Sequence, residues 1–554
     1  MNPEAIVGWV VVFVLLAVTV AGLARRIGWS APVLLVVIGA GISFIPGVPR
    51  VQLEPEFVLY GVVPALLFAA AFGTSVVDVR ARRDTIVQLS VGLVVFTVVT
   101  VGWVTHLVLP MIGLAAAFAF AAVVSPTDAS AVTAIAGRLK LPRRVVTVLE
   151  GESLLNDSAA LVLLNTSIAS IISVTSPGRI AADLALAIVG GVGVGLAGGW
   201  LMATIRSRLR APVLDTSLAL ITPYFAFISA DAIHGSGVLA VVTSALYLGF
   251  RSPEVQSAEA RVAEAVNWRT ASFLIENAVF LFIGLNTAAI VSGAATELTG
   301  WGTVGVCAAV IGTLFSARFV FVFAMVGIFK HGTRYMRTQD LRWKNATIIS
   351  AANVRGVITL AAVFLLPPET PGRSLLQLMA FVVVVVSLFT GLLLPRLARL
   401  LNLTAPDAIR EHSAWEDLMA QAQARGLERL EAEVTDRDHE RVVGQLRVNA
   451  TLIADSLRLD TDQDEKLMMT YQRLRQVMIR AERQYVISAR RQHLFPETVV
   501  AAALRSIDIE ELALRSAPVL DEIERSPRAD WGERMPPRRA NNGPKRSRPE
   551  GDDR

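Results

Sequence analysis

Long apolar segments recur through the first 400 residues of this 554-residue chain, and they constrain its fold more than any other feature. A helix needs about 20 apolar residues to cross roughly 30 Å of hydrocarbon. We predict about thirteen such spans, near residues 5–24, 31–47, 56–76, 85–110, 111–136, 145–174, 180–205, 212–230, 233–250, 268–293, 302–328, 345–367 and 375–399. The sequence therefore predicts an all-α polytopic membrane protein.

Positive charge alternates between the connections that join these spans. The connections after spans 1, 3, 5, 7, 9 and 11 carry Arg25 and Arg26; Arg80, Arg82 and Arg83; Arg138, Lys140, Arg143 and Arg144; Arg206, Arg208 and Arg210; Arg251 and Arg261; and Lys330, Arg334, Arg337, Arg342 and Lys344. The other connections carry only Arg50, Arg179 and Arg373. The positive-inside rule then places the N-terminus outside and the C-terminus in the cytoplasm. These loops account for the net charge of +5, so no nucleic-acid partner is expected.

The composition changes near residue 401, which divides the chain into a membrane domain, 1–400, and a polar remainder. Within 401–525, two segments, 415–434 and 464–492, mix Leu, Met and Ala with dense charge at helical spacing. We expect 401–525 to form a helical cytoplasmic domain. Residues 526–554 lack apolar periodicity and are predicted to be a disordered, solvated tail.

The number of spans suggests an internal repeat. If spans 1–6 and 8–13 are equivalent, their offset of seven gives them opposite orientations, which is the arrangement of many secondary transporters. Interrupted helices are expected at matching positions of such repeats. Pro126 in span 5 and Gly356 in span 12 mark these two breaks. The repeat is inferred from topology, not from sequence identity between the halves.

Asp128 and Asp157 lie in apolar sequence, where a carboxylate is costly. A charge at mid-membrane depth costs several kcal/mol, so a chain that retains two in neighbouring spans is expected to use them. Ser153, Asn156 and Asp157 are spaced i, i+3 and i+4 and share one helical face. Pro126 frees carbonyl groups next to Thr127.

These residues supply the oxygen ligands that a hard monovalent cation requires, from Thr127, Asp128, Ser153 and Asp157. The pattern predicts a site for a monovalent cation at Asp128 and Asp157, and it indicates that ions or protons cross the bilayer there. The alternative is that these groups only hydrogen-bond one another between helices.

Four further charges lie in apolar spans: Glu152, Glu276, Arg318 and Arg355. Two arginines and two glutamates can neutralise one another, which would leave Asp128 and Asp157 to bind ions. We expect a structural role for Glu152, Glu276 and Arg318. Arg355 lies beside the break in span 12. It is equally suited to a structural role and to balancing the charge of the ion site.

Other chemistries lack support in the sequence. The single cysteine, Cys307, excludes an internal disulfide, and the six histidines show no metal-ligand spacing, so no cofactor is expected. Gly193, Gly195 and Gly198 match GxGxxG, but no strand precedes them, and helix packing by small residues explains them better. No hydrolase motif surrounds Ser153, so the chain is not expected to be an enzyme.

At these residues the chain resembles the cation:proton antiporter family, which contains bacterial sodium/proton antiporters and animal sodium/proton exchangers. The resemblance covers roughly residues 1–400 and is closest to the bacterial branch with a long cytoplasmic tail. Its matching stretches, in order, are SPTDASAV, LEGESLLNDSAALVL, SADAIHGSGVLAVV, ENAVFLFIGL, SARFVFVF and VRGVITLA.

The resemblance implies roles for individual residues. Asp157 matches the essential ion- and proton-binding carboxylate, and the residues that match further members or neighbours of the ion site are Asp128, Thr127, Ser153 and Asn156. Glu152 and Arg318 match a structural ion pair, and Arg355 matches an important arginine on the second broken helix. The family fold implies a homodimer, each subunit having a dimerisation domain and a moving core domain.

The chain departs from the family pattern at Ala69, where members often carry a glutamate. If that glutamate coordinates the ion elsewhere, water or another group must replace it here. The departure leaves the cation selectivity open.

These features together predict an antiporter that exchanges Na+, or K+ or Li+, for protons across the plasma membrane and serves pH and sodium homeostasis. Asn156 before Asp157, in place of a second aspartate, resembles the electroneutral branch of the family and implies one proton per cation. A cation channel, or a membrane sensor that signals through its cytoplasmic tail, is the alternative.

Overall fold

The computed structural model describes residues 3–27, 31–45, 55–128, 143–172, 177–209, 211–294, 300–331 and 343–403, with short stretches between 421 and 511. Regular structure in these residues is entirely helical. The main helices are α1 (Pro3–Ile27), α2 (Ala31–Ser43), α4 (Val63–Phe72), α7 (Leu93–Val108), α8 (Leu114–Val124), α10 (Arg143–Ile172), α11 (Pro177–Arg206), α12 (Pro212–Asp231), α13 (Gly237–Val255), α14 (Ala258–Leu285), α15 (Thr287–Ala294), α16 (Gly300–His331), α18 (Trp343–Ala351), α19 (Val357–Val363), α20 (Arg373–Gly391) and α21 (Leu394–Leu400).

Many of these helices are suited to a bilayer. Seven described helices are long and apolar enough to cross a membrane, and four shorter apolar helices accompany them. Large apolar side chains remain exposed on their outer faces, including Val189 on α11 and Trp301 on α16, as expected for contact with lipid. The chain is therefore a multi-pass, all-α membrane protein, as its sequence predicts, while the number thirteen stays a prediction.

One predicted span has different boundaries in the structure. The segment expected at 268–293 is divided, because α14 begins at Ala258 and ends at Leu285, and α15 follows after Asn286. Ser257 caps the start of α14 by accepting a hydrogen bond from the Ala260 backbone. The charged turns before the apolar run therefore continue the helix, and Arg261 belongs to α14 instead of a loop.

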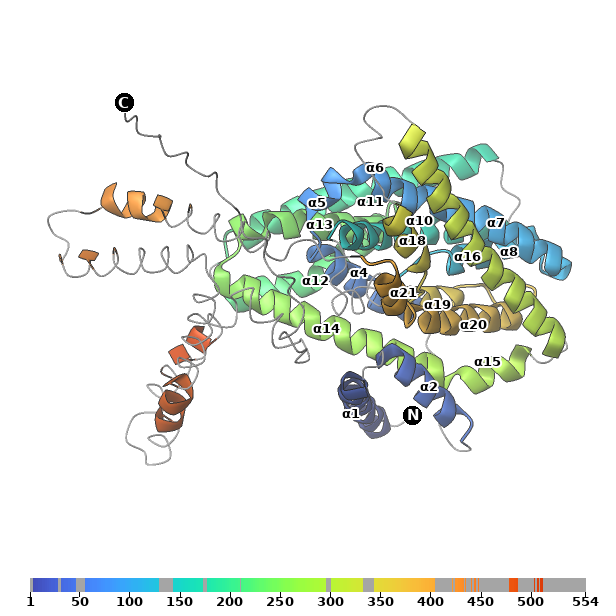
Figure 1. The fold of residues 1–554 in the computed structure, drawn as a ribbon, viewed down its shortest axis with the longest axis horizontal. Coiled ribbons are helices and arrows are strands. Elements are labelled where there is room, and N and C mark those ends of the chain that lie inside the picture. Colours follow the sequence, from blue (N-terminus) through green and yellow to red (C-terminus); the bar gives the residue numbers. More distant parts are fainter. Residues whose placement is uncertain are drawn as a thin grey trace, which may run out of the picture. The chain divides into compact units, whose positions relative to one another are not determined.

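The membrane helices pack into two bundles. The α13 bundle comprises α2, α4, α11, α12, α13 and α14, and the α10 bundle comprises α7, α8, α10, α16, α18, α19 and α20. Figure 1 shows α14 as one long helix that ends beside α2, and α19 beside α20. Helices of the two bundles also meet, where α10 contacts α13 and α11 and where α14 contacts α19.

Glycines bring the helices of the α13 bundle together. A Cβ at Gly195 would lie 2.6 Å from the Ala240 carbonyl oxygen on α13, and one at Gly284 would lie 2.6 Å from the Val36 carbonyl oxygen on α2. No side chain fits at these contacts. The glycine-rich stretch of α11 thus serves helix packing, as expected, although a Cβ at Gly193 would meet nothing within 4 Å.

The sequence analysis counts Arg206 in the connection after span 7, whereas in the structure Arg206 is the last residue of α11. Arg206 lies at the end of α11 and is buried, with ion pairs to Asp215 of α12 and Glu264 of α14. Gln256, after α13, donates hydrogen bonds to both carboxylates, at 3.2 Å to Asp215 and 2.5 Å to Glu264. The guanidinium therefore ties together the ends of several helices and adds no free positive charge to its loop.

The chain divides into two compact units, residues 1–406 and 407–554. In the second unit, helical stretches at 424–432 and 478–486 lie within the two segments expected to be helical. Arg483 forms an ion pair with Glu511 at 2.5 Å. The tail predicted at 526–554 lies outside the described residues.

Candidate functional site

Two interrupted helices meet at the centre of the α10 bundle. Helix α8 ends at Val124 and continues as non-helical chain to Asp128, and residues 352–356 separate α18 from α19. The Asp128 backbone N–H donates to the Val354 carbonyl oxygen at 2.8 Å, so one break is hydrogen-bonded to the other. The sequence predicts breaks at Pro126 and Gly356. Helix α8 ends just before Pro126, with residues 129–142 outside the described part of the chain, and Gly356 lies in the non-helical link between α18 and α19.

A cavity of about 340 Å³ lies beside these breaks. Both bundles line it: α4 and α14 provide one wall, with Ala69, Thr74, Ser272 and Glu276 among others, and α10 and the two interrupted helices provide the opposite wall, with Thr127, Asp128, Glu150, Ser153, Asp157 and Thr359 among others. The cavity thus lies between the two bundles.

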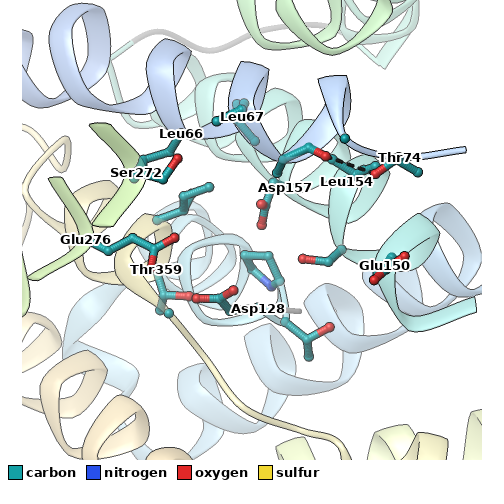
Figure 2. Close-up of a pocket in the computed structure, with 18 residues that line it drawn as sticks. Leu66, Leu67, Thr74, Asp128, Glu150, Leu154, Asp157, Ser272, Glu276 and Thr359 are labelled. Atoms are coloured by element: carbon teal, nitrogen blue, oxygen red, sulfur yellow. Dashed lines mark hydrogen bonds between the residues drawn. The ribbon is translucent and has the colours of Figure 1, made fainter. Parts of the chain in front are cut away.

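Asp157 contributes a buried carboxylate to this cavity. Its residue is 7% exposed, and no hydrogen bond or ion pair involves its carboxylate among the residues that the structure describes. Ser153 lies one helical turn earlier on α10 and lines the same cavity. Figure 2 shows the side chains of Asp157 and Asp128 near each other in this space. The structure therefore brings together Asp128, Ser153 and Asp157, which the sequence singled out.

Asn156 has a different position from its neighbour. It is buried, it does not line the cavity, and its amide donates to the Thr127 carbonyl at 3.2 Å and hydroxyl at 3.0 Å. Thr127 in turn donates its hydroxyl proton to Glu152 Oε1 at 3.0 Å. Asn156 therefore holds the broken segment that carries Asp128 against α10.

Glu152 and Arg318 form a buried ion pair. Arg318 Nη2 donates to Glu152 Oε2 at 2.9 Å, Nη1 donates to Oε1, and Nε donates to the Ile349 carbonyl at 3.0 Å. The guanidinium thus links α10, α16 and α18. Its charge is neutralised within the pair and does not reach the cavity carboxylates directly.

Arg355 lies in the second break and is 2% exposed. Its Nε donates to the Val124 carbonyl at 2.9 Å, at the C-terminus of α8, and its Nη1 donates to the Asn353 carbonyl at 2.9 Å. A cation is favourable at a helix C-terminus, where carbonyl groups lack partners. Arg355 therefore links the end of α8 to the break between α18 and α19 by hydrogen bonds to carbonyl groups of both.

Glu276 does not pair with an arginine in the described part of the chain, although the sequence analysis expects such a pair. It lines the cavity from α14, and within the described part of the chain it forms neither an ion pair nor a hydrogen bond. Sequence reasoning also missed Ser272 and Thr359 as cavity residues. Ser272 lies four residues before Glu276, so their shared helical face was the available signal.

Gly356 is required by close packing. A Cβ at this position would coincide with the Asp128 carboxylate. The absence of a side chain therefore leaves the space that Asp128 occupies.

Carboxylate and hydroxyl oxygens around this cavity suit a monovalent cation with part of its water shell. The described residues include no group of three acidic, histidine or cysteine side chains close enough to hold one metal ion together.

Comparison with known proteins identifies the family. Residues 11–400 match the family model described as sodium/hydrogen exchanger, transmembrane. A relative from Mycobacterium tuberculosis, named as an uncharacterized Na+/H+ exchanger, is 32% identical over 92% of this chain and 96% of its own length. A Bacillus subtilis relative, named as a sodium, potassium, lithium and rubidium/H+ antiporter, is 28% identical over 68% of this chain and 59% of its own.

A solved structure shares the fold. The sodium proton antiporter MjNhaP1 from Methanocaldococcus jannaschii aligns with a TM-score of 0.60 at 19% identity, over 73% of this chain and 99% of that one. Together with the family match across residues 11–400, these similarities show that the chain belongs to the transmembrane sodium/hydrogen exchanger family.

Proposed function

We propose that this protein exchanges Na+ for protons across the membrane, that both ions bind in turn at Asp157, and that Asp128 is a further ligand of the cation. The observation that carries the proposal is the Asp157 carboxylate, which is buried, makes no described hydrogen bond and opens into a cavity shared with Asp128. A bare carboxylate is costly in such a place, so binding a cation or a proton stabilises it. The two ligands then compete for one group, which couples their movements.

The cavity's position supports a carrier. Its two walls belong to different bundles, so a displacement of the α10 bundle relative to the α13 bundle would close the cavity on one side and open it on the other. The bound cation or proton removes the charge that makes this displacement costly. The alternatives are a channel and a sensor that signals through its tail. Neither requires that a bound ion neutralise a carboxylate between two bundles that move relative to each other.

The loop charges suggest which side the cavity faces. Gly73 and Thr74 line it at the end of α4, and Arg80, Arg82 and Arg83 follow. By the positive-inside rule this end is cytoplasmic, which places the N-terminus outside and the C-terminus inside. We propose that this conformation is open toward the cytoplasm.

The number of protons exchanged per cation depends on how many acidic groups at the site release a proton. The Asn156 side chain is a neutral amide that holds Thr127 and exchanges no proton during transport, so Asp157 is the acid of the Asn–Asp pair. We propose electroneutral exchange, one proton per cation, by a homodimer in the plasma membrane that serves pH and sodium homeostasis. The B. subtilis relative's name supports K+ and Li+ as further cargo. Transport of this kind involves no enzymatic activity.

Purified protein in proteoliposomes tests the proposal. With a pH-sensitive dye inside, an inward Na+ gradient should drive proton efflux and raise the internal pH, and the response should persist when valinomycin and K+ clamp the membrane potential at zero. Asp157→Asn should abolish it, whereas Glu259→Gln, an exposed change on α14, should not. Unaltered flux in a folded Asp157→Asn protein would refute the assignment. Flux that follows only the membrane potential would indicate a channel.

A further inference from the structure

We propose that Glu276 is a third charged group of the cation site, supplied by the α13 bundle, and that it sets the affinity for the cation. This inference rests on the proposed function, because it assigns Glu276 to the ion held at Asp128 and Asp157. Glu276 acts across the cavity and is a positioning residue, since the described carboxylates do not converge as a group of three on one ion in this conformation.

The location of Glu276 carries the first step. Helix α14 packs on α2, α4 and α12, so its side chains move with the α13 bundle. Glu276 projects from this helix into the cavity, and Figure 2 shows it on the side of Thr359 and Asp128. Among the cavity residues it is the carboxylate that the α13 bundle provides, whereas Asp128, Glu150 and Asp157 come from the α10 bundle.

The second step concerns the nearby arginines, which bond to groups other than Glu276. Arg318 is paired with Glu152, and the hydrogen bonds of the Arg355 guanidinium go to carbonyl groups. Glu276 has neither guanidinium as a partner in the described residues. A partly buried acidic group that faces a cavity without a protein cation as partner is suited to attract a mobile one.

The third step follows from the two walls. Because Glu276 and Asp157 belong to different bundles, relative movement of the bundles changes the distance from Glu276 to a cation held at Asp157. The attraction is therefore strongest in one conformation and weaker in the other. Glu276 would raise the affinity on the side where the cavity is open and help release the ion after the movement.

Ala69 provides a rescue test on the same wall. It lies on α4, lines the same cavity and is only partly buried, so a longer side chain at this position would enter the cavity. Ala69→Glu in the Glu276→Gln background would restore a carboxylate to the α13 bundle from a different helix. A structural role for Glu276 would not be rescued in this way.

The experiment measures initial exchange rates against Na+ concentration in proteoliposomes. Glu276→Gln should raise the KM for Na+ about tenfold, which is about 1.4 kcal/mol in binding free energy, and change the maximal rate by less than about threefold. Glu276→Asp and the double variant Ala69→Glu/Glu276→Gln should recover most of the affinity. Glu259→Gln, a carboxylate change on the exposed first turn of α14, should match the unaltered protein.

A second readout separates this inference from the exchange function. The rise in melting temperature caused by NaCl relative to choline chloride in detergent reports cation binding without flux. Glu276→Gln should need about tenfold more Na+ for the same rise. An unchanged Na+ dependence, or a lower melting temperature with no change in either KM or Na+ dependence, would overturn the role of Glu276. Unaltered protein that binds Na+ in this assay but drives no proton flux would refute the exchange proposal alone.

Discussion

The ion pair between Glu152 and Arg318 should be a stability element of the membrane domain and not part of the ion site. Both residues are almost fully buried, at 1% and 2% exposure. Glu152→Gln would leave the Arg318 guanidinium without its countercharge while the Ile349 carbonyl and one amide oxygen remain as acceptors.

The expected magnitude follows from this burial. Removing one partner of a buried pair costs about 3–5 kcal/mol, because the remaining charge is desolvated and uncompensated. At about 2 °C per kcal/mol for a large domain, the melting temperature in detergent should fall by on the order of 5–10 °C. Arg318→Met alone should have a similar effect, since it leaves the Glu152 carboxylate buried.

The double variant distinguishes charge compensation from lost packing. Glu152→Gln with Arg318→Met removes both charges and should recover part of the lost stability, because no unpaired ion remains. Thermal unfolding of purified protein, followed by tryptophan fluorescence, measures all three variants. The reasoning fails if the single changes leave the melting temperature unaltered and shift the KM for Na+ instead, or if the losses of the two single changes simply add.

Three further results are expected. Gly356→Ala should lower the exchange rate at least about tenfold with little loss of protein, because its Cβ would occupy the space of the Asp128 carboxylate; a normal rate in proteoliposomes would contradict this packing. Arg206→Met should destabilise the protein by about 3–5 kcal/mol, since two buried carboxylates lose their cation, which a melting temperature equal to that of the unaltered protein would disprove. Truncation after Leu401 should preserve Na+-driven proton flux in a sample shown to be folded by size exclusion, because the proposed ion site lies before it; complete loss of flux would place the tail in the transport cycle.

The sequence predicted the parts of the site that depend on local pattern. Asp157 and Ser153 share a helical face through their spacing, and both line the cavity. Pro126 and Gly356 mark helix breaks because one lacks a backbone N–H and the other lacks a side chain; in the described residues α8 ends just before Pro126, and Gly356 lies between α18 and α19. The assumed repeat predicted breaks at matching positions, and the hydrogen bond that joins them, from Asp128 to Val354, is a finding of the structure.

Other features depend on which helices become neighbours, and no local pattern specifies this. Glu276 was expected to pair with an arginine, but its helix faces the cavity, and the arginines bond elsewhere. Arg206 ends an apolar helix and resembles a loop residue in the sequence, yet Asp215 and Glu264 reach it from α12 and α14. Long-range packing decides both cases.

Proton release on Na+ binding tests the central claim, that one carboxylate binds both ions in turn, most directly. Purified protein in weakly buffered detergent solution, with a soluble pH dye, receives NaCl or, as the control, choline chloride at equal ionic strength. We predict release of about one proton per bound Na+ near the pH of half-maximal exchange, and none from Asp157→Asn. Sodium binding without proton release, or undiminished release from Asp157→Asn, would contradict the account.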